Sequence, residues 1–213
     1  GYVVDTDRAR AEALASQAGA RATTELAEVL GNVDLATVAV PTQAHAEVAE
    51  ALLGAGVHLL IEKPLTATLE EADRVVGLAA AKGLVLRVGH LERFNPALVG
   101  VRDRIAAPRF MECHRLAPFK PRGTDVDVVL DLMIHDLDII LSLVDSPVAE
   151  VRANGVPVLT GGIDIANARI EFANGCVANV TASRVSAKSM RKLRVFQPDC
   201  YVSIDFQDRE VDL

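Results

Sequence analysis

The feature that most constrains the fold is an alternation of strand-like and helix-like segments in the first 88 residues. Short apolar runs rich in β-branched residues alternate with stretches in which alanine and leucine recur at helical spacing. Strands are expected at 1–5, 34–40, 57–61 and 84–88, and helices at 8–18, 25–30, 45–53 and 69–82. Strands that are joined by helices pair in parallel through crossover connections. The sequence therefore predicts an α/β domain with a doubly wound parallel sheet in residues 1–92.

The second half of the chain follows a different pattern. One long apolar helix is expected at 128–143, and short strands separated by turn residues follow it. These strands are expected at 148–158, 167–173, 176–183, 192–197 and 201–206. Consecutive strands that are joined by short turns form antiparallel sheets. The sequence therefore predicts a second, α+β domain with an open antiparallel sheet in residues 93–213.

Composition limits the functions that this chain can have. Of the 213 residues, 50% are hydrophobic, which is enough for a buried core. The formal charge of −7 arises from 22 basic and 29 acidic residues that form no long block, so binding to nucleic acid is not expected. The apolar stretches are shorter than the roughly 18 residues of a membrane span, so membrane insertion is not expected either. We expect a soluble protein whose partner is a small molecule.

The cysteines indicate a cellular compartment, and the first residues indicate whether the Rossmann-type domain is complete. Cys113, Cys176 and Cys200 are odd in number and lack metal-type spacing, so we expect a cytoplasmic protein without a metal site. The chain starts at Gly1 inside a strand pattern, without the glycine-rich turn that holds a pyrophosphate in Rossmann-type folds. We therefore expect a fragment of a longer enzyme with an incomplete Rossmann-type sheet. Such a fragment keeps its reactive groups but lacks the backbone amides that hold the cofactor.

Candidate ligand-binding residues follow three of the predicted parallel strands. They are Asp5, the pair Pro41-Thr42, and the tripeptide Glu62-Lys63-Pro64. Ligands of doubly wound sheets bind beyond the carboxyl ends of the strands, so these residues are expected at one crevice. Asp5 has the position of an acid that accepts hydrogen bonds from an adenine ribose, and capping of the next helix is the alternative. Arg8 or Arg10 could instead meet a 2′-phosphate, which leaves NADP open beside NAD.

Lys63 and a polar helical stripe are the candidate reactive groups. Lys63 leaves a buried strand, so its ammonium can hydrogen-bond a substrate oxygen, and a solvated charge is the alternative. Asp131, His135 and Asp138 form a single polar stripe, at spacings of four and three residues, on an otherwise apolar helix. A histidine can take up a hydroxyl proton near neutral pH, and a neighbouring carboxylate orients it. For the stripe alone, a hydrogen-bonded core histidine is the competing interpretation.

Four motifs occur together, and their order is more specific than any one of them. The motifs are Val3-Val4-Asp5-Thr6-Asp7, Ala39-Val40-Pro41-Thr42-Gln43-Ala44-His45, Glu62-Lys63-Pro64 and Asp131-x-x-x-His135. With them the chain resembles the Gfo/Idh/MocA family of nicotinamide-dependent sugar oxidoreductases. The resemblance implies that NAD binds through Asp5, Thr6, Arg8, Pro41, Thr42, His45, Glu62, Lys63 and Arg93. It also implies that residues 89–96 cross between the domains, where His90 and Arg93 reach cofactor or substrate.

The resemblance further implies a reaction, which is hydride transfer between nicotinamide and a secondary alcohol of a sugar or nucleotide sugar. In it His135 accepts the hydroxyl proton, Asp131 orients His135, and Lys63 polarises the oxygen. The stretches 131–138 and 191–196 are similar to those of members that oxidise the 3-hydroxyl of UDP-N-acetylglucosamine. Substrate contacts are expected from Lys63, Arg115, Lys120 and His135. The basic residues before the helix, which also include Arg122, could meet a diphosphate, although solvated charges on an exposed loop explain them equally well.

Two alternative functions require residue patterns that differ from the pattern seen here. A non-catalytic sensor of cofactor and sugar typically loses the lysine or the histidine of the site, and both are present here as Lys63 and His135. A short-chain dehydrogenase needs a Tyr-x-x-x-Lys pair, whereas the tyrosines here are Tyr2 and Tyr201. Proteins that this chain resembles commonly pair through the second domain's sheet, so a homodimer or homotetramer is expected.

Overall fold

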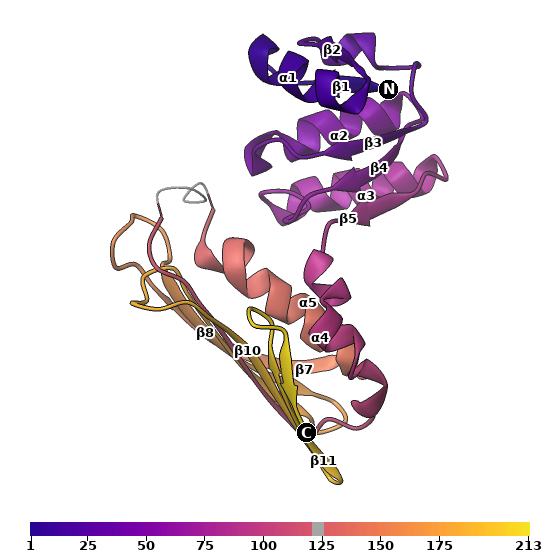
Figure 1. The fold of residues 1–213 in the computed structure, drawn as a ribbon. Coiled ribbons are helices and arrows are strands. Elements are labelled where there is room, and N and C mark those ends of the chain that lie inside the picture. Colours follow the sequence, from indigo (N-terminus) through magenta and orange to yellow (C-terminus); the bar gives the residue numbers. More distant parts are fainter. Residues whose placement is uncertain (121–125) are drawn as a thin grey trace. The chain divides into compact units, whose positions relative to one another are not determined.

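The chain forms two compact units, Gly1–Gly89 and His90–Leu213 (Figure 1). This computed structural model describes residues 1–120 and 126–213. Every helix in these two ranges is too short or too polar to cross a lipid bilayer. Within the same ranges, no three His, Cys, Asp or Glu side chains are grouped as a metal site requires.

The first unit is an alternation of strands and helices, as the sequence predicts. Its elements are β1 (Tyr2–Val4), α1 (Arg8–Ala18), β2 (Arg21–Thr23), η1 (Leu26–Glu28), β3 (Leu35–Val38), η2 (Thr42–Ala44), α2 (His45–Gly54), β4 (His58–Ile61), α3 (Leu69–Ala81) and β5 (Leu86–Val88). The expected parallel pairing is confirmed, because β1 pairs with β2 and the order β3–β4–β5 is parallel throughout. The helix expected at 25–30 is reduced to the 3-10 turn η1, and β2 was not expected.

Local capping explains where the helices of this unit begin and end. The side chain of Asp7 accepts hydrogen bonds from the N–H groups of Ala9 and Arg10, which starts α1. Gly19 ends α1 with a left-handed φ of 62°, a conformation that glycine adopts without strain. Thr68 and Glu71 form a reciprocal capping box at the start of α3. The apolar face of α2 then packs on β3 and β4, and α3 packs beside α2, in a core that includes Leu53, Leu59 and Ile61.

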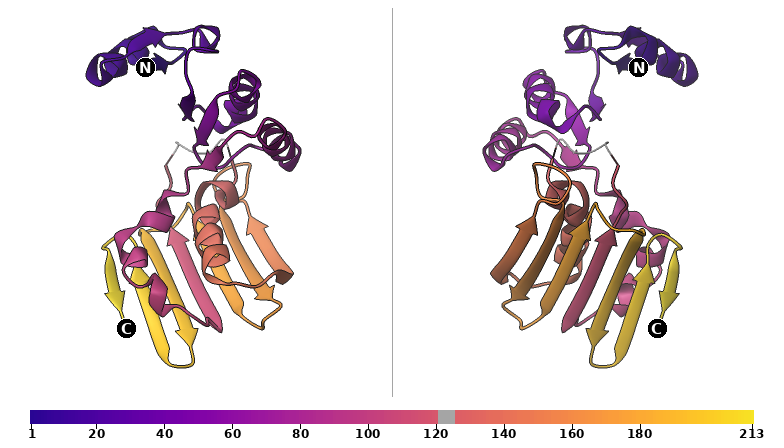
Figure 2. Two further views of the ribbon diagram at one scale, coloured as in Figure 1. Left: turned by 90° about the vertical axis from the view of Figure 1, so that its right-hand side faces the viewer. Right: turned by 90° about the vertical axis from the view of Figure 1, so that its left-hand side faces the viewer.

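The second unit is one seven-stranded sheet with helices on a single face (Figure 2). Its helices are η3 (Leu91–Phe94), α4 (Pro96–Val99), η4 (Arg102–Arg104), the π-helix η5 (Val129–Met133) and α5 (Ile134–Leu143). Its strands are β6 (Phe110–Leu116), β7 (Val148–Val156), β8 (Ile165–Phe172), β9 (Val177–Ser183), β10 (Met190–Gln197), β11 (Cys200–Asp205) and β12 (Glu210–Asp212). The strand order is β12–β11–β10–β6–β9–β8–β7.

The pairing in this sheet is antiparallel, as expected, except between β6 and β9, which are parallel. Strand β6 was not expected from the sequence, yet it is central in the sheet. Alternate residues of β6, Met111 and Cys113 among them, face the helices and join the core with Ile139 and Ile140 of α5. The helix expected at 128–143 is present, but its first turns are a π-helix.

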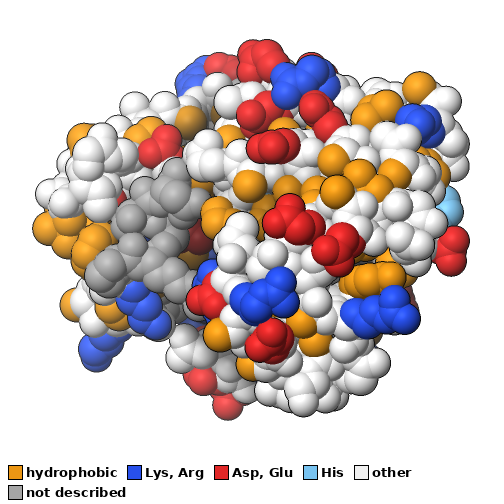
Figure 3. Space-filling model, turned by 90° about the horizontal axis from the view of Figure 1, so that it is seen from above, with side chains coloured by type: hydrophobic (Ala, Val, Ile, Leu, Met, Phe, Trp, Pro, Cys, Tyr) orange, Lys and Arg blue, Asp and Glu red, His pale blue; other side chains and the backbone are white. Residues whose placement is uncertain are grey.

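Charged side chains are mixed on the surface. On the face of the molecule seen in Figure 3, Lys and Arg side chains lie among Asp and Glu side chains. This mixing agrees with the charge distribution along the sequence.

Candidate active site

In the first unit, the backbone directly before Lys63 is fixed by hydrogen bonds to the segments on either side of β4. The N–H of Glu62 donates to the carbonyl of Val38 (2.9 Å), which continues the ladder between β3 and β4. The N–H of Gly89 donates to the carbonyl of Ile61 (2.7 Å) from the β5 side. The Lys63-Pro64 peptide bond is cis. Lys63 is half-buried, and it follows a stretch of backbone that these hydrogen bonds hold at the carboxyl end of β4.

Glu62 lies against the end of β5. A Cβ atom added at Gly89 would lie 3.1 Å from Oε2 of Glu62, which is closer than most real Cβ contacts. Glycine at position 89 therefore leaves room for the Glu62 carboxylate beside the chain that leaves the unit.

The imidazole of His45 lies between two loops at the same edge of the sheet. Its Nδ1 is 2.8 Å from the carbonyl oxygen of Pro64, and its Nε2 is 2.9 Å from the carbonyl oxygen of Val40. The side chain is 1% exposed. Thr42, which starts the 3-10 turn before α2, is also buried, whereas Pro41 is exposed. Both ring nitrogens of His45 are thus directed at the protein's own backbone.

Asp5 follows β1, as expected, but it does not cap α1. Its Oδ1 accepts the N–H of Asp7 (2.8 Å) and lies 3.1 Å from a guanidinium nitrogen of Arg10. The capping role belongs to Asp7. Thr6 and Arg8 are exposed, and Arg8 pairs with Glu12 at 3.6 Å.

In the second unit, Asp131 and His135 lie where the helix changes its hydrogen-bonding pattern. Asp131 is in the π-helix η5, and its N–H donates to the carbonyl of Asp127 (3.0 Å). His135 is in the first turn of α5. Both side chains are half-buried. Single π-helical turns within α-helices occur frequently at functional sites, which agrees with a reactive role for this junction.

The third member of the polar stripe, Asp138, is paired with Arg93. Two guanidinium nitrogens of Arg93 donate to the two carboxylate oxygens of Asp138 at 2.5 and 2.6 Å. This hydrogen-bonded pairing raises the pKa of the Arg93 guanidinium above its usual value. Nδ1 of His90 lies 3.9 Å from Asp138. Asp138 therefore ties η3 to α5.

Arg115 is not on an exposed loop, as the sequence suggested, but on β6 beneath α5. It is 3% exposed and donates two hydrogen bonds to Asp136, at 2.8 and 3.0 Å. Burial alone would lower the pKa of Arg115, but the charge of Asp136 and its hydrogen bonds outweigh burial and raise the pKa. Arg115 therefore attaches α5 to the sheet, in place of the substrate contact that its expected loop position implied. Lys120 is exposed, and Arg122 lies outside the described residues.

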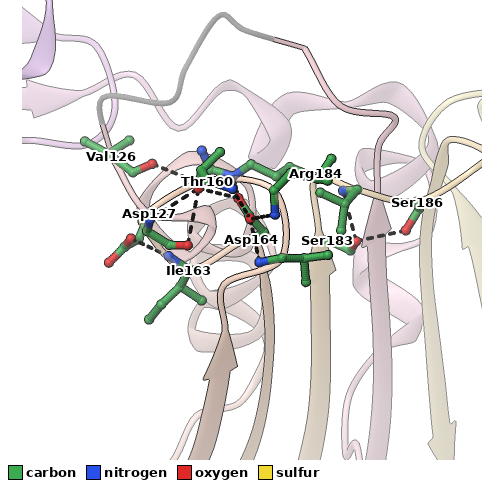
Figure 4. Close-up of polar contacts among 12 residues, drawn as sticks. Val126, Asp127, Thr160, Ile163, Asp164, Ser183, Arg184 and Ser186 are labelled. Carbon is green, nitrogen blue, oxygen red and sulfur yellow. Dashed lines mark hydrogen bonds and ion pairs between the residues drawn. The ribbon is translucent and has the colours of Figure 1, made fainter.

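A buried carboxylate that sequence reasoning missed organises the loop between β7 and β8 (Figure 4). Asp164 is fully buried, and its carboxylate accepts hydrogen bonds from the N–H groups of Val158, Leu159 and Thr160 and from the Thr160 hydroxyl. Burial acts to raise the pKa of Asp164, but these hydrogen bonds outweigh it and hold the pKa well below its ordinary value of 3.8. Arg184, at the end of β9, lies 3.8 Å from Asp164.

The same cluster reaches the start of the helix that bears Asp131 (Figure 4). Arg184 donates to the carbonyl of Val126 at 2.6 Å, and Asp127 accepts the N–H of Ile163 at 2.9 Å. No short sequence pattern marks these contacts, because they join residues that are 36 or more positions apart.

Comparison with known proteins assigns both units. Residues 2–90 match the oxidoreductase family with an NAD-binding Rossmann fold, and residues 104–200 match the GFO/IDH/MocA C-terminal domain. The chain belongs to the Gfo/Idh/MocA family. The family that the four motifs suggested is therefore confirmed, and so is the NAD-binding type of fold.

Among relatives in this family, UDP-N-acetylglucosamine 3-dehydrogenase of Acidithiobacillus ferrooxidans is 45% identical over 205 residues, which are 96% of this chain and 66% of that protein. A solved structure of the enzyme from that organism has a TM-score of 0.92 and 44% identity, covering 99% of this chain and 70% of that one. Myo-inositol dehydrogenase Hyg17 of Streptomyces leeuwenhoekii is 32% identical and covers 85% of this chain and 61% of its own length. The chain thus spans about two thirds or less of these curated relatives.

Proposed function

We propose that the protein is an NAD-dependent dehydrogenase that oxidises a secondary alcohol of a nucleotide sugar, namely the 3-hydroxyl of UDP-N-acetylglucosamine. The observation that carries the proposal is the 45% identity to the Acidithiobacillus ferrooxidans enzyme across 96% of this chain. The presence of Lys63, Asp131 and His135 supports it, because a non-catalytic sensor does not need these groups.

The proposed roles follow from the chemistry of each side chain. Bound NAD supplies the acceptor for the hydride. The Lys63 ammonium donates a hydrogen bond to the substrate oxygen, which stabilises negative charge as the proton leaves. The His135 imidazole takes this proton, and Asp131 orients the ring and favours its charged form. We assign residues 1–92 to the cofactor and residues 93–213 to the substrate.

The remaining cofactor contacts are proposals that the local structure supports to different degrees. Asp5 follows β1, and its carboxylate lies beside the N-terminus of α1 through its contacts with Asp7 and Arg10, a position that suits a ribose hydroxyl. Thr42 follows β3, and Glu62 and Lys63 follow β4. Pro41 is exposed directly before Thr42, and Arg8 is exposed at the start of α1, after β1. Arg93 is half-buried and held by Asp138, so its contact with a cofactor would come from its remaining N–H groups.

The test is a substrate screen with the full-length protein. UDP-N-acetylglucosamine, inositols and free aldoses are each incubated with NAD or NADP, and nicotinamide reduction is followed by absorbance. We expect turnover with UDP-N-acetylglucosamine and NAD. Tight NAD binding without turnover of any alcohol would instead identify a sensor.

We also propose that the protein is a cytoplasmic homodimer or homotetramer that associates through the sheet face left free by α4 and α5. Phe110, Phe196 and Tyr201 form an aromatic row there, with ring centroids 5.9 and 5.1 Å apart. Phe196 and Tyr201 are 38% and 41% exposed, which suits an association surface. The free cysteines Cys113, Cys176 and Cys200 suit a reduced compartment. Light scattering on the protein and on Phe196→Glu measures the association, and a monomeric wild type would exclude it.

A further inference from the structure

His45 contacts the two loops that leave the carboxyl ends of β3 and β4. The oxygen facing Nε2 belongs to Val40, two residues after β3, and the oxygen facing Nδ1 belongs to Pro64, directly after Lys63. The ring is 1% exposed, so no solvent separates it from these carbonyls. A neutral imidazole donates from one nitrogen, and the doubly protonated ring donates from both. The neutral ring therefore donates to one of the two carbonyls and packs against the other, whereas the doubly protonated ring donates to both, so the ring contacts both loops.

Pro64 directly follows Lys63, and this explains why the contact between His45 and the carbonyl of Pro64 matters for Lys63. On the amino side of Lys63, the N–H of Glu62 is held by Val38 at 2.9 Å. On the carboxyl side, proline has no N–H to give, so the carbonyl of Pro64 is the first backbone group after Lys63 that can be held there. His45 holds it at 2.8 Å. Lys63 therefore lies between two fixed backbone positions, one supplied by a strand and the other by a histidine.

The following residues strengthen the same anchor. Thr66 is buried, and its hydroxyl donates to the carbonyl of Thr68 at 2.8 Å. Thr68 and Glu71 then close the capping box of α3. The loop after Lys63 is thus fixed to α2 through His45 and to α3 through its cap. Of these contacts, the one from His45 is nearest to Lys63 in the chain.

We propose that His45 is a positioning residue, which holds the loop that carries Lys63 in register with the loop that carries Pro41 and Thr42, and which does not itself bind the cofactor. The kinetic part of this proposal rests on the proposed dehydrogenase activity. Both ring nitrogens face backbone carbonyls, so neither is directed at a ribose hydroxyl. The family resemblance implied that His45 contacts NAD; in this proposal its role is indirect.

His58 offers a matched control on the same strand. It lies at the amino-terminal end of β4, and its Nδ1 accepts the N–H of Val85 at 2.9 Å. Replacing His58 removes a histidine–backbone hydrogen bond from β4 without touching the carboxyl end of the strand. His45→Gln is the conservative variant, because its amide can still donate to a carbonyl.

The first experiment needs no activity. Hydrogen exchange is measured by mass spectrometry on wild type, His45→Ala, His45→Gln and His58→Ala. We expect His45→Ala to speed exchange about tenfold in peptides covering 40–46 and 62–68, because those loops lose their shared contact. His58→Ala should speed exchange in peptides covering 57–59 and 84–86 and leave the first two unchanged. Unchanged exchange at 62–68 in His45→Ala would overturn the proposal, and if His45→Ala fails to fold, His45→Leu, which fills more of the space but has no donor, decides in its place.

The second experiment separates positioning from general stability. In the full-length enzyme, His45→Ala should lower kcat about tenfold to a hundredfold, because small displacements of a catalytic group are costly. In the Lys63→Ala background the same substitution should change kcat less than about twofold, since the group to be positioned is gone. His45→Gln should recover part of the loss, and His58→Ala should leave kcat unchanged in both backgrounds. Equal effects of His45→Ala with and without Lys63, or a rise in the Kd of NAD that accounts for the loss, would refute the positioning role. Absence of turnover in wild type would refute the proposed function alone, and the exchange experiment would still decide the role of His45.

Discussion

The two regions that carry the proposed catalytic residues are held in place by different kinds of contact. Around Lys63 they are backbone hydrogen bonds and one imidazole, all at the end of a parallel strand. Around His135 they are ion pairs between side chains, Arg115 with Asp136 and Arg93 with Asp138. The difference follows from the elements involved. A strand is fixed by its ladder, whereas a helix on a sheet face touches the sheet through side chains alone.

The ion pairs beside α5 fix the position of a helix on a sheet, which β4 does not need because its own ladder fixes it. Apolar contacts between α5 and the sheet, such as those of Ile139 and Ile140, hold the helix on the sheet but do not strongly favour one position along it. A bidentate pair is directional, so Arg115 and Asp136 favour one position of α5 on β6. Such a pair contributes little net stability, but it makes the loss of either partner costly.

The largest expected effect comes from breaking the buried pair on one side. Asp136→Asn keeps the volume of the side chain and removes the hydrogen-bonded counter-charge of the buried Arg115, which leaves only the more distant carboxylate of Glu92, 3.9 Å away. We expect a loss of about 3–5 kcal/mol in the free energy of unfolding, measured by urea denaturation. Arg115→Met combined with Asp136→Leu should restore most of it, since apolar residues can replace a buried ion pair.

The exposed pair of Glu150 and Arg152 is the control for this prediction. Their side chains are 48% and 70% exposed, so Arg152→Ala should leave the unfolding midpoint unchanged. An Asp136→Asn protein as stable as wild type would show that the ion pair is not what fixes α5.

The next largest effect is on turnover, and it is measured for one residue from each region, Lys63 and His135. In the full-length protein, Lys63→Ala and His135→Ala should each lower kcat by roughly a hundredfold or more, as loss of an acid–base or polarising group does. The Kd of NAD, measured by fluorescence titration, should change much less. Combining the two substitutions should cost less than the product of the single losses, because the groups act as a unit. If His135→Ala kept full turnover, the polar stripe would be structural, and only the Lys63 region would remain catalytic.

Particular residues show which parts of the fold the sequence alone predicts. The limits of α1 follow from Asp7 and Gly19, which are local features that a reader of the sequence can recognise. Strand β6 was missed because Arg115 occupies an inward position, where an arginine breaks the alternation of apolar and polar residues. That arginine is acceptable only because Asp136, from a helix later in the chain, neutralises it. Such compensation over a long sequence separation leaves no local pattern.

The same limit applies to the site. Residue type and order were enough to name Lys63, Asp131 and His135 as candidates. The structure adds the π-helical turn at Asp131, which no sequence pattern predicted. The contact of His45 with Pro64 joins residues 19 positions apart, and the Asp164 cluster joins β7, β8, β9 and the start of η5. Sequence patterns thus predicted most of the elements and named candidate reactive groups, but they did not predict the contacts that hold those groups.

A smaller effect should appear when the pH is lowered. It arises from the charge of the Asp164 carboxylate, whereas the backbone hydrogen bonds around Lys63 carry no charge that titrates. The folded pKa of Asp164 lies below its ordinary value of 3.8, so its carboxylate stabilises the fold above that pH and loses this contribution as the pH falls further. Asp164→Asn should therefore be less stable than wild type near neutral pH, and the gap in urea midpoint should narrow below about pH 4. A gap that stays constant with pH would show that the hydrogen-bond geometry of Asp164, and not its charge, matters.

The smallest effect tests how closely the carboxyl end of β4 is packed. Gly77 lies in an exposed position of α3 with open space around its Cα, so Gly77→Ala should raise the free energy of unfolding by about 0.5–1 kcal/mol. Gly89→Ala should give less or no gain, because the new Cβ would lie 3.1 Å from the Glu62 carboxylate, which must move by a few tenths of an ångström. Thermal and urea denaturation of the two variants measure the difference. Equal stabilisation by both would mean that Glu62 moves freely, and that the region around Lys63 owes its order to His45 and the strand ladder without help from close packing at Gly89.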